Sequence, residues 1–212
     1  ELARLYPTRV VSVTCDVGSE QAVSALFHTL VAELGGLDLV VSNAGTAPEG
    51  ALDTEGGFEA LTRSLEVNLL SHARIARHAT AIFRAQGRGG CLLFNASKSA
   101  FAPGPGFGPY AIAKSGLVAL TRQLAIDLGG IGVRSNAINA DRVRTALFGD
   151  GVLESRAKAR GLSPDAYFRA NLLSREVTAR DVARTFVHLA TARSTTGAVL
   201  PVDGGNAAAF PR

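Results

Sequence analysis

Cysteine, long apolar runs and strong charge are all scarce in this chain, and each shortage narrows what the protein can be. The chain has 212 residues and two cysteines, Cys15 and Cys91, which both lie in apolar, strand-like runs. We interpret them as buried thiols and expect no disulfide framework. No apolar run approaches the roughly 20 residues that span a bilayer. The first residues, ELARLYPTRV, lack the apolar stretch of a secretory signal. These absences predict a cytoplasmic protein that does not enter a membrane.

The charge balance is mild, at 22 basic against 18 acidic residues and a net charge of +4. No dense Lys/Arg cluster with interleaved aromatics occurs, so we expect no nucleic-acid partner. The histidines are dispersed over helical segments without metal-ligand spacing, and we expect packed or surface histidines and no metal site: His28, His72, His78 and His188. The hydrophobic fraction of 47% is typical of a soluble globular domain with a core of its own.

Strand-like and helical segments alternate along the sequence. Apolar, β-branched runs predict strands at 10–15, 37–42, 91–95, 133–138 and 198–202. Helical periodicity predicts helices at 20–34, 58–83, 110–128 and 178–192, the last with Thr178 as its N-cap. Mostly continuous apolar strands alternating with helices indicate an α/β domain with a parallel sheet covered on both faces. Residues 142–175 are polar and Arg-rich, and we interpret them as an insertion over a binding crevice within one domain, 1–212.

Tyr110, Lys114 and Ser97 are the residues that point most directly to chemistry. Tyr110 and Lys114 lie four residues apart in a predicted helix and so share a face. An ammonium near a phenol stabilises the phenolate, which lowers the Tyr pKa toward the range useful for acid–base catalysis. Ser97 precedes Tyr110 by 13 residues, and the Pro/Gly-rich loop between them could bring both hydroxyls together. These groups suit proton transfer at an alcohol or carbonyl oxygen while a hydride moves elsewhere.

Three further features each allow two interpretations. Asn43-Ala44-Gly45 follows a predicted strand, either as an ordinary turn or as small residues that admit a ligand close to the backbone. Asp16 also ends a strand, either as a helix cap or as a hydrogen-bond partner for a nucleotide base. Asn68 lies among apolar neighbours in a predicted helix, either satisfied by backbone or holding an ordered water in a proton relay.

Taken in order, these motifs resemble the short-chain dehydrogenase/reductase family along essentially the whole chain. They are Asp16-Val17, Ser42-Asn43-Ala44-Gly45, Asn68, Ser97, Tyr110-Ala-Ile-Ala-Lys114, Arg134-Ser-Asn-Ala-Ile-Asn139 and Asp203-Gly204-Gly205. The resemblance implies a Rossmann fold, that is, a three-layer, doubly wound parallel sheet. It also implies a dinucleotide cofactor, NAD or NADP with NAD slightly favoured, and a homo-oligomer, either a dimer or a tetramer.

The resemblance also implies roles for individual residues in hydride transfer between the nicotinamide cofactor and a small alcohol or carbonyl substrate. Tyr110 would be the general acid/base, Lys114 would lower its pKa and bind the nicotinamide ribose, and Ser97 would hold the substrate oxygen. Asn68 would support a water that links Lys114 to solvent. The remaining cofactor contacts would come from Asp16, Val17, Asn43, Ala44, Gly45, Val143 and Thr145. The alternative is a non-catalytic, dinucleotide-fold binding or assembly protein.

A finer similarity joins the chain to the dehydrogenase module of bifunctional rhamnulose-1-phosphate aldolase/lactaldehyde dehydrogenases. It rests on LFNASKSAFAPGPGFGPYAIAKSG, on the turn Asn139-Ala140-Asp141, on YFRANLL at 167–173 and on the ending NAAAFPR. Most family members have Pro-Gly where this chain has Ala140-Asp141. A carboxylate there could narrow the nicotinamide pocket, contact a polar substrate or be an ordinary turn residue.

The other departure is at the front, where the family's first two strands and its Gly-rich turn would precede Glu1. In the strand order 3-2-1-4-5-6, the strand predicted at 10–15 would pair with the second strand, so here its backbone groups would lack a partner. The pyrophosphate would also lose its helix N-terminus. We therefore expect a truncated chain, or one shown without residues that the whole molecule has, and weak cofactor binding by these residues alone.

The Arg-rich stretch raises a last question. Arg156, Arg160, Arg169 and Arg175 could meet an anionic substrate, but a solvated helix face is the favoured interpretation. The finer similarity suggests instead a neutral polyol or aldehyde.

Overall fold

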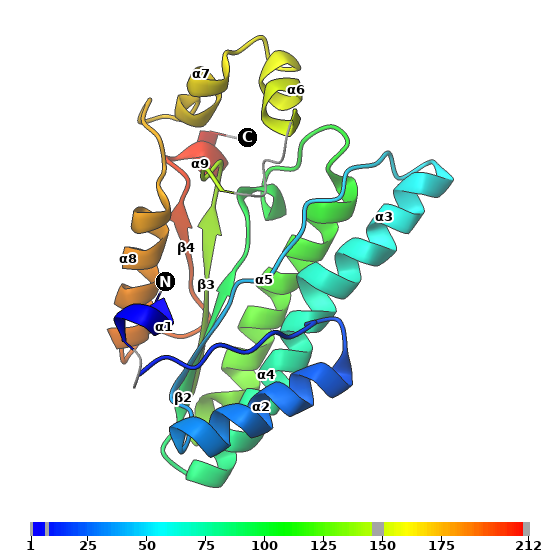
Figure 1. Cartoon of the computed structure of the whole chain (residues 1–212). Helices are drawn as coiled ribbons and strands as arrows, with labels where there is room; N and C mark the ends of the chain where they lie inside the picture. Colours follow the sequence, from blue (N-terminus) through cyan, green and yellow to red (C-terminus); the bar gives the residue numbers. More distant parts are fainter. Residues whose placement is uncertain (1, 7–8, 146–150, 210–212) are drawn as a thin grey trace.

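The computed structural model describes residues 2–6, 9–145 and 151–209 (Figure 1). Its described strands form one parallel sheet whose order, β1-β2-β3-β4, follows the chain. The order therefore does not reverse within the described residues. The strands are β1 (Leu39–Ser42), β2 (Gly90–Asn95), β3 (Val133–Ala140) and β4 (Val199–Val202). Each overlaps a predicted strand, and β3 runs two residues beyond the predicted end.

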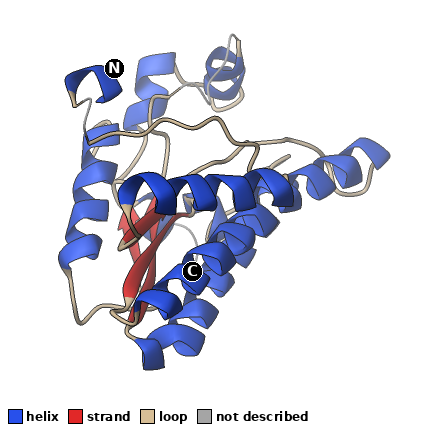
Figure 2. Ribbon diagram, turned by 60° about the horizontal axis from the view of Figure 1, so that its bottom comes forward, coloured by secondary structure: helices blue, strands red, loops and turns tan. Residues whose placement is uncertain are grey.

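Helices cover both faces of the sheet, which confirms the predicted Rossmann-like α/β fold (Figures 1 and 2). On one face Leu92 and Phe94 of β2 pack with α2, α4 and α5. On the other face Cys91 and Leu93 pack with α8. The helices are α1 (Leu2–Leu5), α2 (Glu20–Leu34), α3 (Glu55–Leu65), the π-helical η1 (Glu66–Leu70), α4 (Ser71–Gln86), the 3₁₀-helical η2 (Lys98–Ala100), α5 (Gly108–Leu128), η3 (Gly129–Ile131), α6 (Val152–Lys158), α7 (Pro164–Arg169), α8 (Ala179–Thr191) and α9 (Asn206–Ala209).

Local sequence explains where the main helices begin and end. The Ser19 side chain accepts from the backbone N–H of Ala22 at the start of α2, and Gly35 ends the helix with a φ of 75°. Thr178 and Asp181 form a reciprocal capping box at the start of α8, which confirms Thr178 as the predicted N-cap. The predicted helices therefore form within a few residues of their expected bounds.

The strand predicted at 10–15 is wrong. These residues run extended without strand pairing, and Val11 and Val13 remain more than a third exposed. The β-branched sequence favours an extended backbone, but a strand also needs a neighbour that takes its hydrogen bonds. No described strand pairs with this segment, so its residues adopt an extended backbone without forming inter-strand hydrogen bonds.

The carboxyl ends of the strands gather the polar residues of the sequence motifs at one edge of the sheet. β1 ends before Asn43, β2 ends at Asn95 just before Ser97, and β3 ends before Asp141. Helix α5 begins at the same edge and brings Tyr110 there. In open parallel sheets this is the edge at which ligands bind.

Candidate active site

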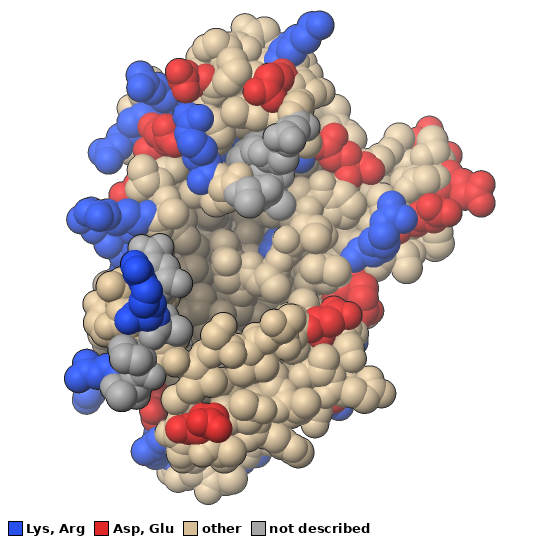
Figure 3. Space-filling model, in the orientation of Figure 1, with Lys and Arg blue, Asp and Glu red and all other residues tan. Residues whose placement is uncertain are grey.

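A cavity of about 460 Å³ opens at this edge of the sheet. Figure 3 shows it as a hollow in the centre of the face drawn, below the helices α6 and α7. Three regions supply its polar and aromatic walls: the strand ends, the loop before α5, and the Arg-rich segment after β3. The residues that carry the argument below are Asn43, Asn95, Ser97, Lys98, Phe107, Tyr110, Asp141, Arg142, Val143, Thr145, Arg156, Arg160 and Tyr167.

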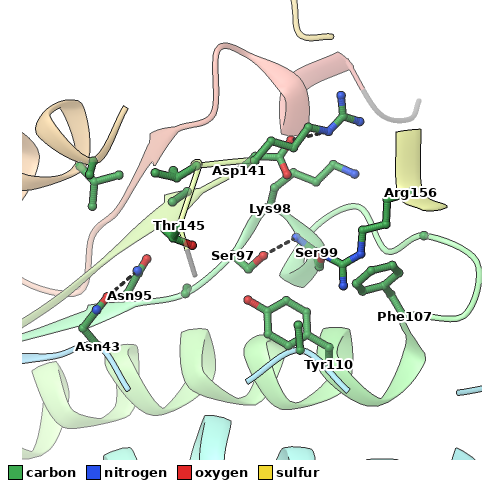
Figure 4. A pocket seen from close by; sticks show the side chains of 18 of the residues that line it. Asn43, Asn95, Ser97, Lys98, Ser99, Phe107, Tyr110, Asp141, Thr145 and Arg156 are labelled. Atoms are coloured by element: carbon green, nitrogen blue, oxygen red, sulfur yellow. Dashed lines mark hydrogen bonds and ion pairs between the residues drawn. The ribbon is translucent and has the colours of Figure 1, made fainter. Parts of the chain in front are cut away.

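Tyr110 and Ser97 face each other across this cavity (Figure 4). Tyr110 lies in the first turn of α5, behind Pro109 at the second helical position. Ser97 is the N-cap of η2, and its Oγ accepts from the Ser99 N–H at 3.1 Å. Burial raises the pKa of the Tyr110 phenol above its usual value, and this outweighs the lowering by its hydrogen bond with Ser97. The structure thus brings together the two hydroxyls that the sequence separates by 13 residues.

Lys114 lies one turn further along α5, 3% exposed. Its Nζ donates to the Asn95 carbonyl at 2.8 Å and lies 5.8 Å from the centroid of the Tyr110 ring. Burial lowers the pKa of Lys114 to about 8. The expectation that Lys114 would lower the Tyr110 pKa is wrong for these residues alone, because loss of solvent around the phenolate dominates and the pKa rises.

Asn68 is fully buried within the π-helical turn η1, close to Lys114. Its Oδ1 accepts from the Thr46 N–H at 3.1 Å, and its Nδ2 donates to Ser64 Oγ at 3.0 Å. A Cβ on Gly45 would lie 3.0 Å from Asn68 Oδ1 and 3.7 Å from Lys114 Nζ. Asn68 therefore fixes the loop after β1 through the backbone, and at Gly45 that loop passes so close to Asn68 Oδ1 that a Cβ would require a shift.

The predicted cofactor residues divide into two groups. Asn43, Val143 and Thr145 line the cavity, and Asn43 Oδ1 accepts from Asn95 Nδ2 at 2.6 Å. Asp16 and Val17 do not line it. The Asp16 carboxylate accepts from the Gly18 N–H at 2.9 Å in the turn before α2. The interpretation of Asp16 as a helix cap is wrong, because Ser19 is the N-cap of α2.

Ala44 is not among the residues that line the cavity, and its backbone forms a hydrogen bond with the buried His72. His72 Nδ1 is 2.6 Å from Ser42 Oγ, and burial and the charge of Lys114 lower the pKa of His72 to about 3. His72 is thus a neutral, packed histidine, one of the two environments expected from the sequence.

Asp141, the departure from the family's Pro-Gly, lies in the cavity wall. Its Oδ2 accepts from the Asn206 side chain and is 3.6 Å from Arg142 Nε. Burial raises the pKa of the Asp141 carboxyl. Arg142 adopts a φ of 48°, a strained conformation for a residue with a side chain, held by hydrogen bonds to the Tyr167 and Ala170 carbonyls. Asp141 is therefore more than an ordinary turn residue.

The interpretation of the Arg-rich stretch as a solvated face is wrong for Arg156, while Arg160 stays exposed although it lines the cavity. Arg156 and Arg160 line the cavity, and only 10% of the Arg156 side chain is exposed. Arg169 is exposed and outside the cavity wall. The helical fragments α6 and α7 are too short for periodicity to show which side faces inward, so the sequence carried no signal for this difference.

Comparison with known proteins places this geometry in a family. The family model described as enoyl-(acyl carrier protein) reductase matches residues 1–207. The chain belongs to the short-chain dehydrogenase/reductase family. It is 34% identical over 208 residues to (+)-borneol dehydrogenase 1 of Salvia officinalis, which covers 94% of this chain and 76% of that protein. The crystal structure of levodione reductase superposes with a TM-score of 0.86 at 25% identity, covering 99% of this chain and 82% of that one.

Another relative is much longer than this chain. An uncharacterized oxidoreductase of Bacillus subtilis, YuxG, is 31% identical over 212 residues, which make up 96% of this chain and 31% of the relative. The chain thus spans about a third of YuxG and about three quarters of the borneol dehydrogenase. Within the described residues, no helix is both long and apolar enough to cross a membrane.

Proposed function

We propose that the protein transfers a hydride between a nicotinamide cofactor and a small alcohol or carbonyl compound, with Tyr110 as the general acid/base. The observation that carries this proposal is the pairing of the Tyr110 and Ser97 hydroxyls in one cavity, with Lys114 one turn away. A substrate oxygen between these hydroxyls would be within reach of both a proton and a hydrogen-bond donor. Membership of an oxidoreductase family and relatives named as a dehydrogenase and a reductase support it.

The chain's own residues fit the nicotinamide half of such a cofactor. Gly45 leaves room beside Lys114 that a Cβ would occupy, and Asn43, Val143 and Thr145 line the adjoining wall. Lys114 would bind the ribose hydroxyls, and the bound cofactor would supply or accept the hydride. The Gly-rich turn for the pyrophosphate has no counterpart among these residues, so NAD and NADP are both compatible with the proposal, with NAD slightly favoured.

Proton transfer follows from the geometry around Tyr110. The raised pKa keeps its phenol protonated near neutral pH, which suits donation from Oη to a carbonyl oxygen during reduction. Ser97 Oγ would donate to the same oxygen and stabilise the developing negative charge. Lys114, with its pKa near 8, would return a proton toward Tyr110. Asn68 would position the loop after β1 and support a water beside Lys114.

The finer features belong to the same proposal. The residues 1–212 would form one dinucleotide-binding domain, with 142–175 as the substrate loop, in a homo-oligomer. The match to nearly all of this chain but a third of YuxG is compatible with the dehydrogenase module of a bifunctional rhamnulose-1-phosphate aldolase/lactaldehyde dehydrogenase.

The test is Tyr110→Phe in the full-length protein, followed by nicotinamide absorbance over a panel of small hydroxy-aldehydes and alcohols. We expect turnover to fall by about 10²- to 10⁴-fold while cofactor binding, measured by fluorescence titration, persists. Tyr6→Phe is the matched control, since Tyr6 is 51% exposed and outside the cavity wall. Unchanged kcat in the Tyr110 variant would refute the mechanism. A wild-type protein that binds cofactor but turns nothing over would favour the non-catalytic alternative.

A further inference from the structure

The wall of the cavity carries an excess of positive charge. Four cationic side chains line it, and Asp141 is the sole carboxylate among its described lining residues. The cationic residues are Lys98, Arg142, Arg156 and Arg160. In Figure 4, Lys98 and Asp141 lie above the Ser97–Tyr110 pair, and Arg156 lies beside it, next to Phe107. Lys98 is buried in this wall, and a buried cation is costly unless something pairs with it, whereas Arg160 stays exposed to solvent.

Aromatic rings hold these arginines in place. The guanidinium carbons of Arg142 and Arg160 lie 4.7 Å and 5.5 Å from the centroid of the Tyr167 ring, which is 4% exposed. The guanidinium carbon of Arg156 lies 4.7 Å from the centroid of the Phe107 ring. An aromatic face orients a cation without neutralising its charge, whereas a carboxylate neutralises it. Arg142 and Arg156 also pair with Asp141 and Glu49, so the charge that is not neutralised is that of Arg160, for which the described residues include no carboxylate at ion-pair distance.

Arg160 differs in this respect from arginines elsewhere on the molecule. Arg74 pairs with Glu20 and Glu66, and Arg144 pairs with Asp165 and Glu176. Within the described part of the chain, no carboxylate lies within ion-pair distance of Arg160, whose Nη1 donates to the Arg156 carbonyl at 3.0 Å. A guanidinium has five N–H donors, so this one backbone acceptor leaves the fork able to bind an oxyanion.

Arg156 has a different role, because its Nε and Nη2 donate to Glu49 Oε1 at 2.9 Å and 2.6 Å. This ion pair joins α6 to the loop after β1. It therefore fixes the Arg156 carbonyl, which accepts the hydrogen bond from Arg160 Nη1. A Cβ on Gly104, in the loop before α5, would lie 3.9 Å from Arg160 Nη2. Arg160, in the turn after α6, thus reaches the loop before α5.

The cationic groups also lie close enough to the reacting hydroxyls to affect them. Arg156 lowers the pKa of Tyr110 through its charge, and Arg142 and Arg160 lower the pKa of Lys98. Lys98 follows Ser97 directly in the chain, and its Nζ donates to the Ala102 carbonyl at 2.9 Å. One substrate molecule can therefore reach Ser97 with its reacting oxygen and the arginines with another group.

We propose that the substrate carries a carboxylate or phosphate in addition to the reacting alcohol or carbonyl group, and that Arg160 and Lys98 bind this oxyanion. The proposal rests on the proposed function and names its substrate class. Arg142 adds positive charge behind the site, while Arg156 and Tyr167 position Arg160.

Direct binding tests this proposal without any need for turnover. Succinate and inorganic phosphate would be titrated calorimetrically into the full-length protein at saturating nicotinamide cofactor, so that the cofactor's own phosphate contacts are occupied. We expect Arg160→Gln to weaken binding of the preferred anion by about 10- to 100-fold, since hydrogen bonds to charged groups are lost. Arg160→Lys should recover part of the affinity. Arg169→Gln is the matched control, an exposed arginine of the same segment outside the cavity wall.

Kinetics with paired substrates distinguish the two anions. One pair is 4-oxobutanoate and its neutral amide, and the other is glyceraldehyde 3-phosphate and glyceraldehyde. The wild type should prefer the charged member of one pair in kcat/KM, and Arg160→Gln should lower that preference by at least about tenfold, mainly through KM. Anion binding that is equal in the wild type, Arg160→Gln and Arg169→Gln would overturn the proposal and leave the role of Tyr110 untouched. Conversely, loss of turnover in Tyr110→Phe with unchanged anion binding supports both the role of Tyr110 as general acid/base and the separate anion site at Arg160.

Discussion

Lys114 should limit the stability of this protein, and replacing it with methionine should reveal by how much. The ammonium is 3% exposed, and its one described hydrogen bond is to the Asn95 carbonyl at 2.8 Å. No carboxylate contributes to its pKa, which burial alone lowers from 10.5 to about 8. A buried cation without an anionic partner opposes folding. Lys114→Met removes the charge while keeping much of the side chain's length and apolar volume.

The magnitude follows from the fall in pKa. Each pKa unit corresponds to about 1.36 kcal/mol between the two protonation states, so a change from 10.5 to about 8 costs folding about 3 kcal/mol at neutral pH. Below pH 8 both the folded and the unfolded chain hold the proton, and the full cost applies. Between about pH 8 and pH 10.5 the folded chain releases its proton first. The unfolded chain then binds more protons, so stability rises with pH, and above this window the cost is gone.

Losing the hydrogen bond to Asn95 works in the opposite direction. It should cost the variant about 1–3 kcal/mol, but this cost is nearly independent of pH, because the neutral amine also donates. The pH dependence therefore isolates the charge. From pH 7 to pH 10, the stability of the wild type relative to Lys114→Met should rise by about 2–3 kcal/mol.

Urea denaturation of both proteins at pH 7 and pH 10 measures this difference by linear extrapolation. Lys158→Met, at an exposed position of α6, controls for a general loss of one lysine. If the difference in the free energy of unfolding between the wild type and Lys114→Met is the same at pH 7 and pH 10, burial of the Lys114 ammonium does not destabilise the fold. That result would contradict the reasoning. Lys114→Met should also lose turnover, because the residue proposed to return protons to Tyr110 is gone.

Two further substitutions probe the surroundings of Tyr110. Gly45→Ala places a Cβ 3.0 Å from Asn68 Oδ1. It should lower kcat/KM by about tenfold and weaken cofactor binding. The control Gly56→Ala adds a Cβ at a position with nothing within 4 Å and should change neither quantity. Asp141→Asn removes a charge that raises the Tyr110 pKa. The alkaline limb of the pH–rate profile for reduction should therefore move to lower pH, and an unchanged or higher limb would show that Asp141 does not act on Tyr110 through its charge.

Much of the fold could be predicted because its signals are local. Apolar runs at 91–95 and 133–138 became β2 and β3, and the Thr178–Asp181 spacing formed a capping box. The proximity of Ser97 and Tyr110 could be predicted from the sequence. Ser97 follows the end of a strand and Tyr110 lies at the start of a helix, and both of these points lie at the same edge of the sheet. In a parallel sheet, the order of strands and helices along the chain largely determines which residues lie together at one edge of the sheet.

The failures share a different cause, since each depended on surroundings that the local sequence does not encode. The segment 10–15 has strand propensity but no described neighbour with which to pair. The Tyr110 pKa was predicted from the sign of Lys114, but burial decided it. Arg156 faces the cavity because Phe107 and Glu49, distant in sequence, hold it there, and Arg160 stacks on Tyr167, which lies in the next helix.

Asp141 and the cationic wall are best explained together. Asp141 lies in the same wall as the cationic residues. Here Lys98 is buried, which lowers its pKa, and Asp141 contributes the largest opposing effect by stabilising the Lys98 ammonium. Asp141 in turn is kept in place by Asn206 and Arg142. The Asp141 carboxylate therefore favours the charged form of Lys98, the residue that follows Ser97.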